Sequence, residues 1–456
     1  VLTPILYCYL SALLINCASD LKNIDSVSVN KSTVISISAQ RWHWYFERHP
    51  VCKMANMRII LIVVTIAVSI LGLSLFANRI YRDTQDEKNG QKDASESPRD
   101  CPCEDPALCN RINDNTTRKE VFVFSLQSQN DSWRFYDWSK VTTIVTVGYM
   151  GFDVMCYAHK HGARAVIIGS MPKDQLTNKS AREKWIAVQL QVVNAYFLDG
   201  INIDFEDVIL QNETDIRDSY TALVNETNMA FKNSYPYLQV TVDIAWSPDC
   251  IDLRCYDYLG ISLVSDFVFV MAYDEQSQIL GKCIAKSNSD YSRTKSGLTK
   301  FLNLGIAPNK MVLGVPWYGY YYPCLSMSRD NVCSLQLVPF RGVNCSDAAG
   351  KEINYNVIVE MLKNSTTGRL WDNVGLSPYF NYIDPATGII HQVRYDDPDS
   401  LLLKYDLALQ YQLRGVGMWQ AEALDYLHNT TDTIKEWKEM WGAIPRFKVP
   451  SIPLMI

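Results

Sequence analysis

The chain has 456 residues, of which 48% are hydrophobic, so it is long enough to bury a large core. Its net charge of -6 at neutral pH gives no general electrostatic reason to bind nucleic acid or an anionic membrane surface. These two classes of partner are therefore excluded as the basis of its function. The length exceeds that of most single domains, but barrels of alternating strands and helices reach about 250 residues or more.

The first hundred residues divide by composition into three segments that we place outside the folded domain. We interpret residues 1–56, which precede two possible initiator methionines, as a leader or an artefact of the gene assignment. Residues 57–77 are predicted to be a signal peptide that is cleaved, because they contain an apolar run at 59–77. An uncleaved signal anchor is the alternative, since the run is about long enough to span a bilayer. The protein would meet a membrane only in the second case. Residues 78–100 are charged and nearly free of apolar residues, which predicts a polar linker.

The cysteine content indicates the cellular compartment. Ten of the thirteen cysteines lie from Cys101 to Cys345, an even number that predicts disulfides, including a local bridge between Cys250 and Cys255. Sequons for N-glycosylation predict the same secretory route, at Asn115, Asn130, Asn178, Asn212, Asn225, Asn344, Asn364 and Asn429. The spacing of "CPCEDPALC" (101–109) also allows zinc, and "HKH" (159–161) is a second metal candidate. An oxidising compartment favours disulfides in the first, and the second lacks partner ligands, so we expect no metal.

Eight apolar segments of strand length follow one another after Cys101. They are 120–125, 141–150, 163–170, 199–206, 238–246, 266–274, 311–319 and 415–419. Stretches with room for helices separate them, and one, 180–197, repeats its apolar positions at intervals of three and four. This alternation predicts an α/β fold, a (β/α)8 TIM barrel over residues 101–445. A doubly wound open sheet is the alternative.

The connection between the seventh and eighth strands is unusually long. It spans roughly a hundred residues and contains Cys324, Cys333 and Cys345. It also contains two strand-like segments, 379–384 and 389–396. We therefore expect a small inserted α+β subdomain over residues 320–396, at one side of the barrel mouth. Residues 446–456 are expected to form a C-terminal tail.

The fourth predicted strand carries an unusual set of polar residues in "DGINIDFE" (199–206). Side chains alternate along a strand, so Asn202, Asp204 and Glu206 face one side and the apolar residues face the other. In a barrel Glu206 would lie at the carboxyl end, where such barrels place their chemistry. Asp204 would lie roughly 6.5 Å away along the strand, near enough for one carboxylate to raise the pKa of the other. The pattern predicts a protonated acid near neutral pH, and a buried network without chemistry is the alternative.

This motif resembles the DGxDxDxE signature of family 18 glycoside hydrolases, the chitinase-like barrels. Segments that resemble one branch of the family run in unbroken order from about Cys101 to Trp441, among them "VMAYDEQSQI", "GVPWYGYYYPC" and "LRGVGMWQAEALDY". Asn202 stands where the chitinase signature has Asp, although that branch also reads "DGIN". Because Asn202 cannot share a proton with Asp204 as a carboxylic acid would, we expect Asp204 to stay directed toward Glu206.

The resemblance implies a reaction and the residues that perform it. The reaction is hydrolysis with retained configuration, in which the acetamido group of the substrate is the nucleophile. The resemblance implies that Glu206 protonates the glycosidic oxygen, Asp204 orients the acetamido group and Tyr273 holds its carbonyl. Trp419 matches the tryptophan that forms the floor beneath the −1 sugar. The candidates for contact with the substrate are Asp199, Asn202, Asp274, Trp317 and Trp419.

The resemblance also implies the substrate, a β-1,4-linked pair of N-acetylglucosamine residues. Such pairs occur in the di-N-acetylchitobiose core of N-glycans and in short chitin oligomers, and an exo-acting enzyme would release the reducing-end sugar. We expect a monomeric lysosomal protein that needs no cofactor. The alternatives are a chitin-binding lectin on the same barrel and a membrane-anchored glycosidase. The presence of Glu206, Asp204 and Tyr273 together favours an enzyme over a lectin.

Overall fold

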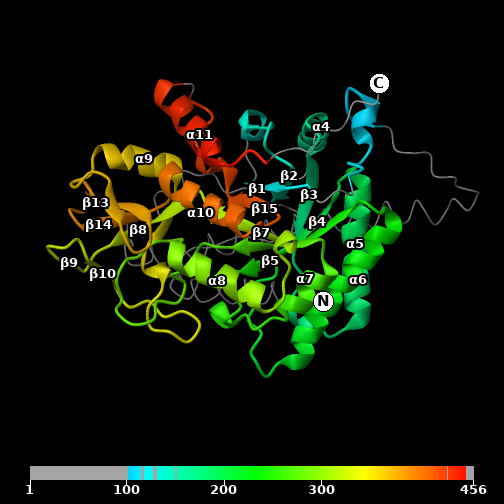
Figure 1. Cartoon of the computed structure of the whole chain (residues 1–456), viewed down its shortest axis with the longest axis horizontal. Coiled ribbons are helices and arrows are strands. Elements are labelled where there is room, and N and C mark those ends of the chain that lie inside the picture. The colour runs from blue at the N-terminus through cyan, green and yellow to red at the C-terminus, as the bar shows by residue number, and fades with distance from the viewer. Residues whose placement is uncertain (1–100, 115–117, 127–130, 149–150, 429, 448–456) are drawn as a thin grey trace, which may run out of the picture. The chain divides into compact units, whose positions relative to one another are not determined.

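The computed structural model of the protein describes residues 101–114, 118–126, 131–148, 151–428 and 430–447. Eight parallel strands close into a barrel in the order β1-β15-β7-β6-β5-β4-β3-β2 (Figure 1). They are β1 (Glu120–Leu126), β2 (Thr143–Val147), β3 (Arg164–Gly169), β4 (Gly200–Ile203), β5 (Gln239–Ala245), β6 (Phe267–Met271), β7 (Met311–Pro316) and β15 (Gly415–Trp419). The predicted (β/α)8 barrel is confirmed. The open sheet is excluded because every barrel strand has a neighbour on both sides.

Helices surround the barrel in the part of the chain that the structure describes (Figure 1). They are α4 (Phe152–Lys160), α5 (Lys179–Ala195), α6 (Thr214–Ser234), α7 (Tyr258–Val264), α8 (Tyr291–Asn303), α10 (Pro398–Gln410) and α11 (Thr431–Ala443). Short 3-10 helices lie at Pro106–Cys109, Ser132–Phe135, Lys173–Gln175, Ile251–Leu253, Pro308–Lys310, Asp347–Ala349 and Ala421–Ala423. The apolar residues of the β4 motif, Ile201, Ile203 and Phe205, are buried in the layer beneath the helices. This placement agrees with the predicted alternation along the strand.

Several predictions concern residues outside the described ranges. The leader, the apolar run at 59–77 and the linker all lie within residues 1–100, and residues 448–456 belong to the predicted tail. Among the residues that are described, no helix is both long enough and apolar enough to cross a bilayer.

The inside of the barrel is filled by aromatic rings. Four of them contact one another with centroids 5.0–5.6 Å apart, Phe122, Phe124, Phe267 and Phe269. Gly314 makes room for this packing, since a Cβ atom there would lie 2.2 Å from the Phe269 ring. A Cβ atom at Gly417 would likewise be too close, 2.7 Å from the Phe269 ring and 2.2 Å from the Phe122 carbonyl oxygen. A packed interior leaves the strand ends as the place for polar chemistry.

Between β7 and β15 the chain forms the predicted α+β insertion, which the structure confirms. Five antiparallel strands lie in the order β11-β8-β14-β13-β12. They are β8 (Tyr318–Pro323), β11 (Lys351–Asn354), β12 (Leu370–Asp372), β13 (Ser377–Ile383) and β14 (Ile390–Arg394), with helix α9 (Tyr355–Lys363) and a separate ribbon of β9 (Ser326–Met327) and β10 (Cys333–Ser334). Only Trp317 separates β7 from β8, so this sheet starts directly at the carboxyl end of a barrel strand (Figure 1).

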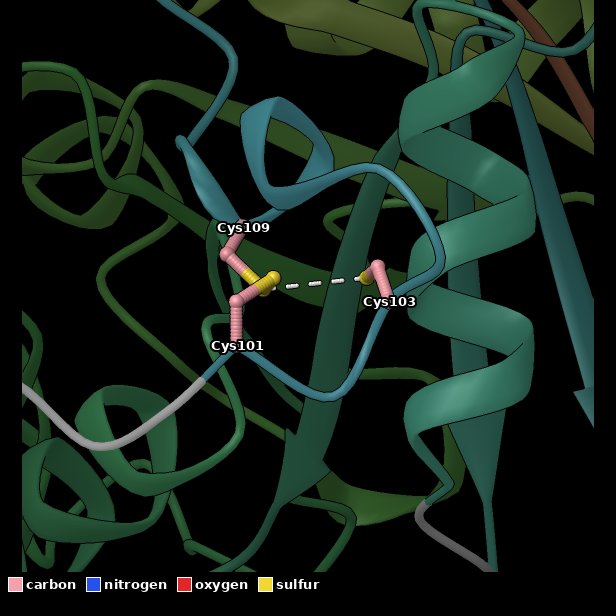
Figure 2. Close-up of side chains that lie close together, drawn as sticks. All are labelled: Cys101, Cys103 and Cys109. Carbon is pink, nitrogen blue, oxygen red and sulfur yellow. Dashed lines mark hydrogen bonds between the residues drawn. A yellow bond between two sulfur atoms is a disulfide. The ribbon is translucent and has the colours of Figure 1, made fainter.

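The ten cysteines from Cys101 onward form five disulfides. The pairs are Cys101–Cys109, Cys103–Cys156, Cys250–Cys255, Cys283–Cys345 and Cys324–Cys333. The sulfur atoms of Cys101, Cys103 and Cys109 lie within 4.8 Å of one another, a grouping that could hold a metal ion. Figure 2 shows the bond between Cys101 and Cys109, with Cys103 facing it across the loop. Because all three sulfurs are oxidised, none offers the thiolate that zinc needs, and the disulfide interpretation is confirmed.

A buried hydrogen-bond network fixes the amino end of β4. One oxygen of Asp199 accepts from the Ala165 amide at 2.8 Å and lies 2.7 Å from His159 Nε2, and the other accepts from the Ile112 amide. His159 Nδ1 lies 2.6 Å from the Leu108 carbonyl oxygen, so both ring nitrogens face acceptors. Burial favours the neutral ring, but the hydrogen bond and charge of Asp199 outweigh it and raise the pKa of His159. His159 thus acts as a structural anchor.

We expect His159→Gln to lower the free energy of unfolding by about 1–3 kcal/mol at pH 5, because it removes a buried charge-assisted hydrogen bond. The folded-state pKa of His159 is raised, so the stabilisation is fully present below the unfolded value near 6.5 and is lost as pH rises through the folded value. Denaturant unfolding from pH 5 to pH 9 measures this, and the difference from the wild type should shrink. His428→Gln is the control, since His428 is exposed. A difference that stays constant with pH would contradict the charged pair.

Candidate active site

Side chains from distant parts of the sequence meet at the carboxyl end of the barrel, the mouth, because all eight strands run in parallel. Asp204 and Glu206 follow β4, Tyr273 and Asp274 follow β6, and Trp419 ends β15. The negative charges of Glu206 and Asp204 reach the Tyr273 hydroxyl and help to raise its pKa, after the larger effect of burial. The structure therefore brings these five predicted residues to one end of the barrel.

Asp204 occupies the most unusual environment of the mouth. Its backbone amide donates to the Gly169 carbonyl at 2.9 Å and so continues the pairing of β4 with β3. Within the described ranges its buried Oδ1 has no hydrogen-bond partner. Burial and the charge of Glu206 raise the pKa of Asp204 to about 7, against the opposing charge of Arg254. At neutral pH, Asp204 can therefore exist in both the protonated and the charged form, as the spacing of the motif predicted.

A hydrogen-bonded group lies one pleat deeper in the barrel. Asn202 donates from Nδ2 to Asp243 Oδ2 at 2.6 Å, and its Oδ1 accepts from the Thr241 hydroxyl at 2.7 Å. Burial and the charge of Asp204 raise the pKa of Asp243, which the hydrogen bond from Asn202 partly offsets. Asn202 has no exposed surface, so its predicted contact with a sugar is wrong. Its side chain instead forms a hydrogen bond with Asp243. Asp243 was missed, although strand alternation places it inside the barrel.

Glu206 has a side chain that is 52% exposed, and its Oε1 accepts from Arg254 Nη1 at 3.1 Å. Arg254 is only 9% exposed and also donates from Nη2 to Asp252 Oδ2 at 2.9 Å. Although burial disfavours the charged guanidinium, the charges of Glu206 and Asp252 raise the pKa of Arg254. Arg254 is not among the residues that the sequence predicted for the site. Its position within the disulfide-closed loop after the fifth strand was the signal that could have found it.

Tyr273 and Asp274 lie against the insertion. The ring of Tyr273 contacts that of Tyr318 edge-on, with centroids 6.1 Å apart, and its raised pKa keeps the hydroxyl a neutral donor. Asp274 Oδ1 accepts from the hydroxyls of Tyr318 and Tyr320. Burial raises the pKa of Asp274 to about 6, although these hydrogen bonds oppose the shift. The insertion therefore supplies two tyrosines of the mouth, of which only Tyr318 could have been suspected from its place at a strand end.

Two predicted residues lie away from the mouth. Asp199 is at the amino end of β4, where two amides and His159 occupy its oxygens, so its predicted contact with a sugar is corrected to a structural role. Trp317 is fully buried and packs edge-on against Trp441 of α11, with centroids 5.1 Å apart. Strand alternation explains the second correction, since Tyr318 faces the barrel interior and its neighbour Trp317 must face the helices.

Trp419 lies at the top of the aromatic filling of the barrel. Its ring centroid is 5.3 Å from that of Phe124, and the side chain is only partly buried. It belongs to the same apolar cluster as Tyr273. An aromatic face is therefore available at the same end of the barrel as the carboxyl groups that follow β4.

Comparison with known proteins defines the class of this barrel. Residues 112–423 match the profile of glycosyl hydrolases family 18, and the chain belongs to this family. The protein is therefore a glycoside hydrolase, and the resemblance of the β4 motif is confirmed.

The chain is similar to two mammalian proteins along most of their length. Di-N-acetylchitobiase of Mus musculus is 44% identical over 345 residues, which cover 76% of this chain and 93% of that protein. Di-N-acetylchitobiase of Homo sapiens is 45% identical over 347 residues, covering 76% and 88%. A solved structure of the Ostrinia furnacalis Group IV chitinase in complex with allosamidin has a TM-score of 0.55 at 17% identity, covering 72% of this chain and all of that one, which shows the fold alone.

We expect Asn202→Asp to make stability fall with rising pH. The new carboxyl group would lie beside Asp204 and Asp243, whose pKa values are already raised, so its own folded-state pKa should also be raised. The folded state would then bind more protons than the unfolded chain, and stability is lost above the unfolded value of about 3.9. Thermal unfolding at pH 4.5 and pH 8 should show a larger loss at pH 8. Asn303→Asp, at an exposed position, is the control. Equal losses at both pH values would contradict the buried network.

Proposed function

We propose that the protein hydrolyses the β-1,4 linkage between two N-acetylglucosamine residues, with Glu206 as the proton donor. The observation that carries this proposal is the contrast between the two carboxyl groups of the β4 motif. Glu206 is half exposed at the mouth and accepts from Arg254, whereas Asp204 has a buried oxygen without a hydrogen-bond partner in the described chain and a pKa raised to about 7. Two carboxyl groups in different environments suit a proton donor and an orienting group.

The nucleophile is proposed to be the acetamido carbonyl of the substrate. An ordinary retaining pair needs a second carboxylate roughly 5–5.5 Å from the first, on the opposite face of the sugar. Asp204 lies on the same strand segment as Glu206, and Asp274 is buried and held by two tyrosine hydroxyls. Neither is placed as a free nucleophile, which favours substrate assistance.

The remaining residues of the mouth fit roles in that mechanism. Asp204 would accept a hydrogen bond from the acetamido N–H and share charge with the oxazolinium intermediate. The neutral Tyr273 hydroxyl would donate to the acetamido carbonyl, and Asp274 beside it would contact the sugar. Trp419 would offer its ring to the C–H face of the pyranose, since a flat apolar surface suits that face.

The proposed substrate is di-N-acetylchitobiose and similar short oligomers, because the mammalian relatives are di-N-acetylchitobiases. A lectin on the same barrel is disfavoured, since Glu206, Asp204 and Tyr273 are all present at the mouth. We also propose the lysosome as the compartment, reached through the secretory pathway. The five disulfides and the exposed asparagines of the described sequons support this route, Asn178, Asn212, Asn225, Asn344 and Asn364.

We expect Glu206→Gln to abolish turnover, because glutamine keeps the shape of the side chain and loses the transferable proton. General acid catalysis typically contributes about 10²–10⁴-fold, so kcat should fall by at least about a hundredfold while sugar binding persists. Release of N-acetylglucosamine from chitobiose measures kcat, and calorimetric titration measures binding. Tyr273→Phe should cost less, since the proton donor remains. A Glu206→Gln enzyme that keeps more than about a tenth of wild-type activity would exclude Glu206 as the acid.

We expect cleavage to require the acetamido group of the −1 sugar. A substrate with a free amino or hydroxyl group at that carbon lacks the internal nucleophile and should be essentially inert. The first product should keep the β configuration, because two displacements at one carbon restore it. NMR at early times measures the anomer. Efficient cleavage without the acetamido group, or an α product, would overturn substrate assistance even if Glu206 proved essential.

A further inference from the structure

Arg254 connects the two loops that follow β4 and β5 at the barrel mouth. Its two terminal nitrogens go to different carboxylates, Nη1 to Glu206 and Nη2 to Asp252. The guanidinium is 9% exposed and Glu206 is 52% exposed, so a buried cation lies beneath a carboxyl group that still reaches solvent. In the part of the chain that the structure describes, Glu206 Oε2 has no protein partner.

The backbone around Arg254 is held from both sides. The Ile209 amide donates to the Leu253 carbonyl and the Cys255 amide donates to the Ile209 carbonyl, both at 3.0 Å, so Arg254 is paired with the segment just after Glu206. The disulfide between Cys250 and Cys255 closes the same loop. Arg254 is therefore fixed relative to the proposed acid by backbone contacts as well as by its side chain.

Asp252 is itself anchored from other elements. Its Oδ1 accepts from the Ser277 hydroxyl at 2.6 Å, and Ser277 lies in the loop after β6. Arg341 of the insertion donates to the Asp252 carbonyl at 2.8 Å and to the Glu206 carbonyl at 3.0 Å. Asp252, the second partner of Arg254, is therefore held by residues from the loop after β6 and from the insertion.

We propose that Arg254 is a positioning residue for the hydrolysis. It holds Oε1 of Glu206, so that the proton is carried on Oε2 and directed to the glycosidic oxygen. This inference rests on the proposed function, in which Glu206 is the proton donor. In the first step Oε2 gives its proton to the glycosidic oxygen while the bond from C1 to that oxygen breaks and the acetamido oxygen bonds to C1. In the second step water bonds to C1, the bond to the acetamido oxygen breaks, and the water proton returns to the Glu206 carboxylate, which the contact with Arg254 stabilises in between.

The shape of the side chain matters as much as its charge. A guanidinium presents its donors in a rigid planar fork, and here one branch serves Glu206 and the other serves Asp252. Lysine carries the same charge on a flexible stem and cannot hold both carboxylates in one fixed geometry. Charge and geometry can therefore be separated by substitution.

The charge of Arg254 should also affect the pH dependence of the reaction. Ionisable groups from several elements surround Asp204 and Glu206. They are Tyr220 of α6, Asp243 of β5, Asp252, Arg254 and Tyr256 after β5, Tyr273 and Asp274 after β6, and Arg341 of the insertion. Among them, the positive charge of Arg254 opposes the rise in the pKa of Asp204. Its removal should raise the pKa of Asp204 further, so that this carboxyl group keeps its proton to higher pH. The alkaline limb of the kcat/KM profile should then move upward.

The experiment compares Arg254→Gln and Arg254→Lys with the wild type on chitobiose from pH 4 to pH 9. We expect kcat to fall by about tenfold or more in both variants, because a group that acts on the proton donor affects the transition state. KM should change by less than about threefold. The alkaline limb should shift to higher pH in Arg254→Gln and stay near the wild-type position in Arg254→Lys, which keeps the charge.

Arg182→Gln is the matched control. Arg182 is also a buried arginine, and it donates to both oxygens of Glu226 between α5 and α6. Its substitution should lower the unfolding temperature without moving the pH profile. Ser277→Ala is a milder test, since it loosens Asp252 and leaves Arg254 and Glu206 in place. It should lower kcat a few-fold at unchanged KM.

The outcomes separate this inference from the proposed function. An active Glu206→Gln enzyme would overturn both. An inactive Glu206→Gln enzyme with folded Arg254 variants that keep the wild-type kcat and pH profile would overturn only the role of Arg254. If the Arg254 variants do not fold, Ser277→Ala decides. An unchanged kcat in that variant would contradict the positioning role, and a reduced kcat at unchanged KM would support it.

Discussion

Asp204 and Glu206 lie two residues apart just after β4, a fully buried strand, and the arrangement of the mouth depends on this pair. A carboxylate that leaves water without a partner is costly, so its surroundings must supply charge, hydrogen bonds or a proton. Burial and the charge of Glu206 raise the pKa of Asp204 to about 7, and Glu206 accepts a hydrogen bond from the guanidinium of Arg254. The two carboxyl groups therefore have different surroundings, one a buried site that favours a proton and the other a contact with a cation at the edge of solvent.

The degree of pairing changes along β4 from one end to the other. Asp199 at the amino end is saturated by amides and His159, and Asn202 in the middle makes a hydrogen bond from each side-chain atom. Asp204 has one buried oxygen without a partner in the described chain, and Glu206 reaches solvent. The saturated end fixes the strand, and the incompletely paired end is the part that can exchange a proton with a substrate.

Strand alternation and element order predicted much of this from the sequence, because both depend on local patterns. The eight strands, the inward polar residues of the β4 motif and the insertion are in this class. The interpretation of Trp317 failed because it considered the strand end without applying alternation, and that of Asp199 failed because the strand begins at Gly200. The loop closed by Cys250 and Cys255 could have drawn attention to Arg254, but its partner could not be predicted. The contacts of Arg254 and Tyr320 form only when the barrel closes and joins segments about 46–48 residues apart.

The insertion and two of the disulfides hold the residues of the mouth in place. Tyr318 and Tyr320 of the insertion hold Asp274, and Arg341 reaches the carbonyl of Glu206. The bridge from Cys283 to Cys345 ties the loop after β6 to the segment that carries Arg341, and Cys250–Cys255 closes the loop that carries Arg254. Both bridges lie next to residues that hold the proposed acid. Oxidative folding therefore bears on the geometry of the mouth directly, and not only on the stability of a barrel whose interior is already well packed.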